Sequence, residues 1–277
     1  MNYKCFDVNI ADGVAHIIMN RPEKRNAMIA EFWKELPAIV QDIDENAKAR
    51  VIVLSSTGPV FCAGIDIGML KTDVGVGKDK NHPQHGASFY PHVTRLQDSM
   101  SSLETCRIPV LAAIQGGCYG GGVDLITACD MRYGTEDSFI SIYEINVGMT
   151  ADVGTFPRIL NHMPEGIVRE LAYTGRKMGA AECKSRGLYN EIYADHAEML
   201  AAVMETAREI ASKPPLAIYG CKRIITYSRD HSTADALDNI AVWNMSMLIP
   251  SEMTKAMMAG QEKRVGKFED LPVIKSQ

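Results

Sequence analysis

The sequence lacks the charge and the hydrophobic runs that mark nucleic-acid-binding and membrane-spanning proteins. It has 277 residues and a formal net charge of -5, and its lysines and arginines form no run. We therefore do not expect the basic patch of a nucleic-acid-binding protein. The longest uncharged stretch, residues 108–123, contains five glycines and a proline, and is too short and too interrupted for a membrane span. Neither nucleic acid nor a membrane is expected among the partners of this chain.

The cysteines lack the spacing of a disulfide framework or of a metal site. There are seven of them, an odd number, and no two form a C-x-x-C pair. Histidines and cysteines do not cluster at the spacing of zinc ligands, so no metal site is expected. Most of the cysteines stand among apolar residues, which is typical of buried, reduced thiols in a reducing compartment.

Targeting signals are also missing from the sequence. The first residues, MNYKCFDVNIADG, read like a strand and contain no basic segment followed by an apolar one. The last four residues, IKSQ, are not the peroxisomal tripeptide. From these absences we expect a cytoplasmic protein.

What is present indicates strands that alternate with helices, followed by a helical tail. CFDVNI and VAHIIMN predict a hairpin joined at ADG, and RVIVLSS and PVLAAIQG predict buried parallel strands. MIAEFWKELPAIVQDIDEN has apolar residues at helical spacing, although Pro37 lies within it. Residues 71–91 are polar and predict a mobile loop or lid, and the chain beyond about residue 195 is almost wholly helical. This order predicts an α/β protein.

Two glycine-containing stretches each follow a strand and precede a helix. GGCYGGGVD does not fit the glycine pattern of a dinucleotide or ATP site. Its glycines allow either close packing of a helix on a strand or main-chain N–H groups that face a ligand. FCAGID has the same arrangement, and two such turns would supply two donors to one oxygen, which is an oxyanion hole. The spacing alone does not separate this interpretation from plain turn chemistry.

Three acidic residues stand in apolar stretches of the sequence. Asp124 ends GGGVD, and Glu144 and Asp152 lie within YEINVGMTADVG. An isolated acid of this kind is more often a helix cap, and Asp152 would cap the VGTFPRIL segment. On one continuous helix Glu144 and Asp152 would lie ~12 Å apart, at a rise of ~1.5 Å per residue. A common site therefore requires a break in the helix, which we predict at Gly148.

These stretches resemble a known family. FCAGIDI and GGGVD are similar to the two oxyanion-hole segments of the crotonase superfamily, the enoyl-CoA hydratase/isomerase fold. GGCYGGGVDLITACDMRY, YEINVGMTADVGT, YSRDHS and WNMSML resemble the dienoyl-CoA isomerases within it, and the likeness runs from RPEKRNAM to about Met247. The resemblance implies a spiral of β-β-α units, with the active site in residues 1–195. Residues 196–277 would form a helical region for oligomerisation and pocket closure, in a homotrimer or homohexamer.

The resemblance also implies roles for individual residues. The N–H groups of Ile65 and Gly121 would hold the thioester oxygen of an acyl-CoA substrate. Glu144 would act at C2 of the acyl chain and Asp152 at C6, with Asp124 as the third catalytic acid. The expected substrate-binding residues are Arg25, Ala63, Gly64, Ile65, Asp66, Ile67 and Gly121. Lys24 and Arg25 either meet the phosphates of coenzyme A or form a solvated loop. No cofactor is expected, since coenzyme A is part of the substrate.

The implied reaction is a proton shift within an unsaturated fatty acyl thioester. A 3,5-dienoyl-CoA would become a 2,4-dienoyl-CoA through a dienolate whose charge collects on the thioester oxygen. One carboxyl must start ionised and another protonated, and burial beside a second carboxylate raises the pKa of a carboxyl. The alternative is a 2-enoyl-CoA hydratase, because Asp124 and Glu144 match the acid pair of superfamily hydratases. A catalytically silent binding protein is disfavoured, because no acid is missing.

Overall fold

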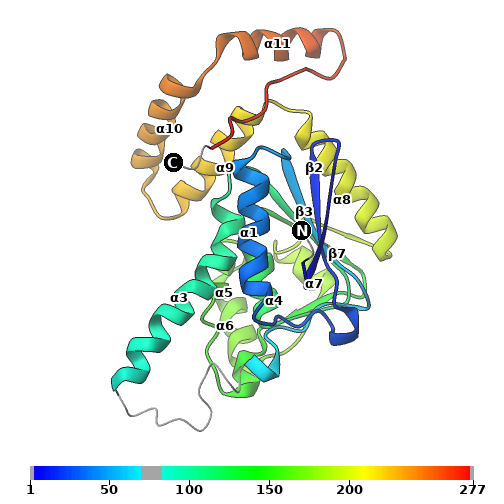
Figure 1. Ribbon diagram of the computed structural model, residues 1–277, viewed down its shortest axis with the longest axis vertical. Helices are drawn as coiled ribbons and strands as arrows, with labels where there is room; N and C mark the ends of the chain where they lie inside the picture. The colour runs from blue at the N-terminus through cyan, green and yellow to red at the C-terminus, as the bar shows by residue number, and fades with distance from the viewer. Residues whose placement is uncertain (1–2, 70–82, 275–277) are drawn as a thin grey trace.

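The chain is built from two β-sheets and the helices that cover them. The structure, a computed structural model, describes residues 3–69 and 83–274 (Figure 1). The larger sheet has six strands in the order β1-β2-β3-β5-β7-β10. These strands are β1 (Phe6–Ala11), β2 (Val14–Met19), β3 (Val51–Ser56), β5 (Val110–Ile114), β7 (Met131–Thr135) and β10 (Glu191–Tyr193). The smaller sheet has the order β4-β6-β8-β9, with β4 (Val60–Cys62), β6 (Gly117–Tyr119), β8 (Phe139–Ser141) and β9 (Met178–Gly179).

From β3 to β8, successive strands of the chain alternate between the two sheets. β3 lies in the larger sheet and β4 in the smaller one, and β5 with β6 and β7 with β8 repeat this step. β3, β5 and β7 pair in parallel, and so do β4, β6 and β8. Each turn of the chain therefore adds one strand to each sheet before a helix returns it to the start. This arrangement confirms the predicted α/β spiral of β-β-α units.

The larger sheet is buried on both faces, which explains why its central strands are apolar throughout. In β3, Ile52 and Leu54 belong to the core on the side of α1 (Phe32–Glu45). The alternate residues Val51 and Val53 pack with α8 (His196–Ala211) on the other face. This alternation is the two-residue period of a strand. The predicted buried strands RVIVLSS and PVLAAIQG are confirmed as β3 and β5.

The N-terminal hairpin also follows its prediction. β1 and β2 pair antiparallel up to Ala11 and Val14, so the turn consists of Asp12 and Gly13. Both turn residues have positive φ, 51° and 74°, as a two-residue hairpin turn requires. The predicted helix is α1, and it continues through Pro37.

The predicted loop at residues 71–91 is partly wrong. α3 (Pro83–Thr105) begins within it, so residues 83–91 are helical, and residues 71–82 lie outside the described residues. A proline is favourable at the first position of a helix, because that position needs no N–H donor. The polar composition was misleading, because α3 is buried only further along, where Met100 and Leu103 enter the core.

The C-terminal region is helical, as predicted. The remaining helices are α4 (Gly121–Thr127), α5 (Thr155–Ile159), α6 (Glu165–Thr174), α7 (Ala180–Ser185), α9 (Pro215–Arg229), α10 (Thr233–Met247) and α11 (Pro250–Gln261). Short 3-10 helices are η1 (Pro22–Lys24) and η2 (Tyr143–Val147). α8 packs on the larger sheet, whereas α10 and α11 project beyond it at the top of Figure 1. Within the described residues, no helix is both long and apolar enough to cross a membrane.

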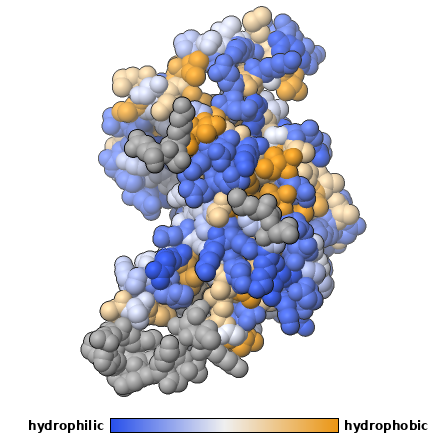
Figure 2. All heavy atoms as spheres, in the orientation of Figure 1, coloured by the Kyte–Doolittle hydropathy of each residue, from blue (hydrophilic) through white to orange (hydrophobic). Residues whose placement is uncertain are grey.

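Apolar side chains are exposed along α10 and α11. They include Leu237, Ile240, Val242, Met245, Met247, Leu248, Ile249, Met253, Met257 and Met258. Figure 2 shows apolar patches between hydrophilic ones in the upper part of the molecule, where these two helices lie. Met245 is 81% exposed, so it does not fill a core of this chain.

Candidate active site

The three predicted acids meet at one cavity of about 180 Å³. The cavity lies where β4 and β6 of the smaller sheet end and the chain turns into helices. It is lined by Ala63, Gly64, Ile65, Ile67, Tyr119, Gly120, Gly121, Asp124, Tyr143, Glu144, Val147, Met149, Asp152 and Val153. Apart from the three carboxyls and two tyrosines, these residues are apolar or glycine. The sequence therefore correctly predicted that Asp124, Glu144 and Asp152 lie together.

Two main-chain N–H groups lie close together at this cavity. Gly121 is the first residue of α4, where no intrahelical acceptor exists for its N–H. Ile65 forms a parallel bridge with Met28, in which Met28 N–H donates to the Gly64 carbonyl and the Met28 carbonyl accepts from Asp66 N–H. The N–H of Ile65 is not used by this bridge. A methyl group added at residue 121 would lie 3.7 Å from the Ile65 nitrogen, so the two amides are close neighbours.

Asp124 is held in α4 and is almost completely buried. One of its carboxyl oxygens accepts hydrogen bonds from the N–H of Thr155 (2.6 Å) and from the Thr155 hydroxyl (2.9 Å). Thr155 is the first residue of α5, so Asp124 caps that helix from outside. Burial raises the pKa of Asp124 to about 6, although the two hydrogen bonds from Thr155 and the charge of Arg158 act in the opposite direction.

Glu144 lies in η2 and reaches over the turn that precedes α4. Its Oε1 would lie 3.1 Å from a methyl group at residue 120, so Gly120 leaves room for the carboxyl. Gly120 also has φ 48° and ψ -119°, which side chains disfavour. Within the described residues, the other oxygen, Oε2, is buried without a hydrogen-bond partner. Burial and the nearby Asp124 carboxyl raise the pKa of Glu144 to about 7.

Asp152 follows a break in the helix, as predicted. η2 ends at Val147, and Gly148 adopts the left-handed conformation with φ 74°. The chain then runs through residues 149–152 without regular secondary structure before α5 begins. Burial raises the pKa of Asp152, while the charge of His92 opposes the increase. Asp152 also raises the pKa of both Asp124 and Glu144, which places the three carboxyls within electrostatic range of one another.

The predicted substrate-binding residues divide into two groups. Ala63, Gly64, Ile65, Ile67 and Gly121 line the cavity. Arg25 and Asp66 do not. The side chain of Arg25 is exposed. Its main-chain carbonyl accepts a hydrogen bond from the N–H of Ala63, which directly follows β4 (3.0 Å). Asp66 accepts from Gly68 N–H (2.8 Å) at the start of the following helical turn.

Several lining residues were missed by the sequence analysis. Tyr119 and Tyr143 form an edge-to-face pair with ring centroids 5.9 Å apart, and both line the cavity. Val147, Met149 and Val153 were missed as well. Their position next to the predicted acids was the available signal, because residues that flank Glu144 and Asp152 in the sequence enclose the same space.

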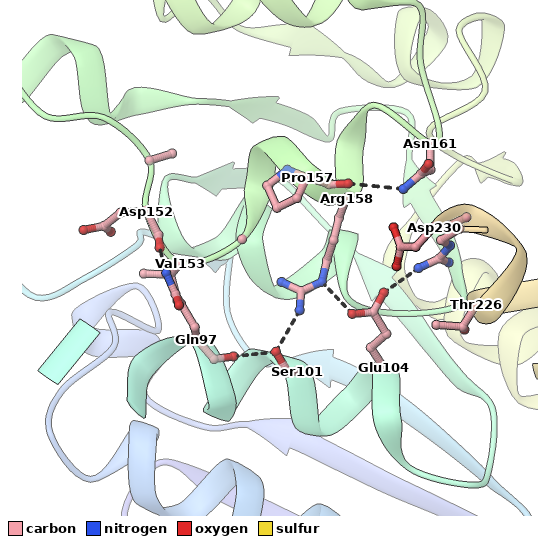
Figure 3. Close-up of a pocket in the computed structure, with 13 residues that line it drawn as sticks. Gln97, Ser101, Glu104, Asp152, Val153, Pro157, Arg158, Asn161, Thr226 and Asp230 are labelled. Atoms are coloured by element: carbon pink, nitrogen blue, oxygen red, sulfur yellow. Dashed lines mark hydrogen bonds and ion pairs between the residues drawn. The ribbon is translucent and has the colours of Figure 1, made fainter. Parts of the chain in front are cut away.

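A second, polar cavity of about 400 Å³ adjoins the first one at Asp152 and Val153. Glu104 lies in its wall and pairs with Arg158 (3.0 Å) and with Arg229 (Figure 3). These three side chains come from α3, α5 and α9. In Figure 3 the Asp152 carboxyl points away from this ion cluster.

The cysteines lie apart from this chemistry. All seven are free, six are buried and Cys221 is exposed. Burial raises the pKa of Cys62 and Cys129 to about 12, so both thiols stay protonated. The prediction of mostly buried, unpaired thiols is confirmed.

Proteins with similar sequences carry an isomerase name. A mitochondrial Delta(3,5)-Delta(2,4)-dienoyl-CoA isomerase of Rattus norvegicus is 40% identical over 270 residues, which cover 96% of this chain and 82% of the rat protein. A peroxisomal Delta(3,5)-Delta(2,4)-dienoyl-CoA isomerase of Arabidopsis thaliana is 37% identical over 276 residues, covering 98% of this chain and 99% of the plant protein.

These relatives overturn the predicted location. The rat and human proteins are named mitochondrial and the Arabidopsis protein peroxisomal, so the cytoplasmic assignment is wrong. The cytoplasmic assignment rested only on the absence of recognisable targeting signals. Such signals are short segments read by receptors, so their absence does not determine the compartment.

The family follows from sequence and fold together. The crystal structure of an enoyl-CoA hydratase from Bacillus anthracis superimposes with a TM-score of 0.85 at 26% identity, covering 96% of this chain and 99% of that one. Residues 9–271 match the family model described as enoyl-CoA hydratase/isomerase. The resemblance drawn from the sequence is thereby confirmed. The chain belongs to the enoyl-CoA hydratase/isomerase family.

Proposed function

We propose that this protein is a Δ3,5-Δ2,4-dienoyl-CoA isomerase, which converts a 3,5-dienoyl-CoA into a 2,4-dienoyl-CoA in the oxidation of unsaturated fatty acids. The observation that carries this proposal is the meeting of three carboxyls with raised pKa values beside two adjacent main-chain amides. The dienoyl-CoA isomerase names of relatives at about 40% identity over most of the chain support the same activity.

Glu144 is the proposed base. As a carboxylate it removes a proton from C2, and the electron pair left behind spreads over the diene and the thioester carbonyl. Within the described residues its Oε2 has no protein partner, so it is free to take this proton. A pKa of about 7 suits a base that must both accept and release a proton near neutral pH.

Asp152 is the proposed acid. Its protonated carboxyl delivers a proton to C6, and the double bonds move to C2 and C4 as the electron pair returns. The substrate thus loses one proton and gains one, and the enzyme ends with Glu144 protonated and Asp152 ionised. Exchange with water restores the starting state. The raised pKa of Asp152 favours the protonated form that this step needs.

Ile65 and Gly121 are the proposed oxyanion hole. Both N–H groups are free of main-chain acceptors in their own elements and lie side by side at the cavity. They would stabilise the charge that develops on the thioester oxygen, and each such donor is typically worth roughly 3–4 kcal/mol of barrier. No cofactor enters this scheme, since every step is a proton transfer.

A 2-enoyl-CoA hydratase is the second candidate, because Asp124 and Glu144 are both present at the cavity. A hydratase needs two carboxyls that together hold and split a water molecule. Asp124 instead accepts two hydrogen bonds from Thr155, which commit one of its oxygens to the start of α5. Asp152, in turn, has no role in adding water. These two features favour the isomerase.

We also propose that the chain forms a homotrimer or homohexamer through the exposed apolar side chains of α10 and α11. Leu237, Met245 and Met257 are each more than 60% exposed, which is costly for a helix that faces only water. Analytical ultracentrifugation tests this: a monomer at micromolar concentration would contradict it. Coenzyme A contacts by Lys24 and Arg25 stay a proposal, supported by their exposure beside Ala63.

The isomerase assay is direct. A 3,5-dienoyl-CoA is supplied and absorbance is followed for a diene conjugated with the thioester, while the product is analysed for added water. We expect conjugation without hydration, and we expect Asp152→Asn to abolish it while the variant still binds the substrate. Formation of 3-hydroxyacyl-CoA from a 2-enoyl-CoA as the main activity would favour the hydratase instead.

A further inference from the structure

The segment that carries Asp152 is tied at both ends to the other two acids. At its start, Met149 N–H donates to the carbonyl of Glu144 (2.9 Å). At its end, Thr155 donates twice to the carboxyl of Asp124. Because residues 149–152 have no helical or strand hydrogen bonds of their own, contacts with neighbouring segments hold Asp152 in place.

A third contact reaches the middle of this segment from α3. Gln97 Nε2 donates to the main-chain carbonyl of Asp152 at 2.6 Å (Figure 3). Among residues 3–69 and 83–274, Gln97 is the residue whose side chain donates a hydrogen bond to the main chain of residue 152. The bond acts on the same residue as the proposed proton donor, but on its main chain, away from the substrate.

The turn of α3 that carries Gln97 is joined to α5 through Ser101. The Ser101 hydroxyl donates to the Gln97 carbonyl (2.8 Å) and accepts from Arg158 Nη2 (2.9 Å). Arg158 also pairs with Glu104, and Glu104 pairs with Arg229. A chain of polar contacts therefore runs from α9 through Glu104 of α3 to Arg158 in the last turn of α5, and from there back to Ser101 of α3, as Figure 3 shows. It fixes α3 relative to the segment that Gln97 holds.

We propose that Gln97 is a positioning residue for the isomerisation, which places the Asp152 carboxyl against C6 of the acyl chain by holding the main chain of residue 152. This inference rests on the proposed function. It separates the two halves of the reaction. Removal of the C2 proton needs Glu144 and the two amides, whereas delivery to C6 needs Asp152 in its place, and only the second half depends on Gln97.

The test is Gln97→Met, which keeps the length of the side chain and removes the donor. We expect kcat for 3,5-dienoyl-CoA to fall about 10- to 100-fold, with KM within about twofold of the wild type. In heavy water, the carboxyl of Glu144 exchanges the proton taken from C2 for deuterium. When proton transfer to C6 is slow, Glu144 returns this deuterium to C2 of the dienolate, and the starting 3,5-dienoyl-CoA is formed again. Unconverted 3,5-dienoyl-CoA recovered from the variant should therefore carry deuterium at C2 while little product has formed.

A matched control comes from α1. Gln41 is exposed, and its Nε2 donates to Glu45 (2.8 Å) in the same helix. Gln41→Met makes the same chemical change on another helix, and we expect it to leave kcat and the exchange at C2 unchanged.

Gln97→Glu adds a second readout. Its carboxyl can donate to the Asp152 carbonyl only when protonated, so its activity relative to the wild type should recover as the pH falls. A merely structural role would not give this pH-dependent rescue.

The possible results separate the two proposals. If the wild type does not isomerise 3,5-dienoyl-CoA, the proposed function fails. If the wild type isomerises and Gln97→Met is equally fast, the positioning role fails. The role also fails if exchange at C2 and product formation fall by the same factor, because the change would then be a general loss of the fold.

Discussion

The two neighbouring cavities share Asp152 and Val153 in their walls, and the carboxyls of one cavity have cationic partners that those of the other lack. At the apolar cavity, Asp152 raises the pKa of Asp124, and both carboxyls raise the pKa of Glu144. Among the described residues, none of the three acids forms a salt bridge. At the polar cavity, Glu104 pairs with two arginines, Arg158 and Arg229. A carboxyl without an ion-pair partner keeps the raised pKa that the proposed proton transfer needs, whereas the paired carboxyl of Glu104 joins three helices. Removing a charge should have opposite consequences in the two places.

The largest effect is expected for Glu144→Gln. The loss of the base should lower kcat roughly 10³- to 10⁴-fold and abolish deuterium exchange at C2, which Asp152→Asn retains. The folded pKa of about 7 lies above the ordinary 4.5, so the ionised carboxylate destabilises the fold as pH rises through 7. The variant should therefore gain up to about 3 kcal/mol above pH 7, fading toward pH 4.5.

Denaturant unfolding at several pH values measures the predicted gain in stability. A Glu144→Gln variant that is less stable than the wild type at pH 8, or that still exchanges deuterium at C2, would contradict the properties assigned here to Glu144.

Glu104→Gln tests the other group of carboxyls. It leaves Arg158 and Arg229 without their counter-charge in a mostly buried place, so we expect the unfolding free energy to fall by about 3 kcal/mol. Glu165→Gln is the control, since it removes an exposed pair with Arg169 on α6 and should change stability by less than about 0.5 kcal/mol. Equal changes in the unfolding free energy of the two variants would show that the buried ion cluster contributes no more to stability than an exposed ion pair.

Gly154→Ala tests the boundary between the two groups. A methyl group at residue 154 would lie 1.9 Å from Arg158 Nη1, and φ there is 131°. We expect a loss of about 2 kcal/mol in stability from the strained backbone and the displaced guanidinium. Gly148→Ala is the matched control, with φ 74° and no atom within 4 Å, and should cost about 1 kcal/mol. If the two thermal unfolding curves coincide, the contact with Arg158 is unimportant.

The pH dependence of the wild type gives a smaller, continuous effect. Glu144 must be ionised to accept the C2 proton, so kcat should fall about tenfold for each pH unit below about 7. Asp152 must be protonated, so activity should also decline at higher pH, and the raised pKa of Asp152 moves that decline upward. A stopped-flow pH profile that is flat between pH 5 and 7 would exclude Glu144 as the base.

The sequence alone predicted the parts of the fold that local rules determine. Apolar β-branched runs identified β3 and β5, and the need to bring Glu144 near Asp152 located the break at Gly148. The start of α3 was missed, because its first turns carry no apolar stripe. Gln97 and Thr155 could not be found either, since each contacts a residue more than 30 positions away. Such pairings depend on how the spiral stacks its turns.

The central claim is that Glu144 ionises near neutral pH because it is buried beside a second carboxyl. Difference infrared spectra of the wild type against Glu144→Gln, recorded across pH, isolate the carbonyl stretch of the protonated Glu144. We expect a midpoint near pH 7 that falls when Asp124 is replaced by Asn. A midpoint near 4.5, unmoved by Asp124→Asn, would contradict it.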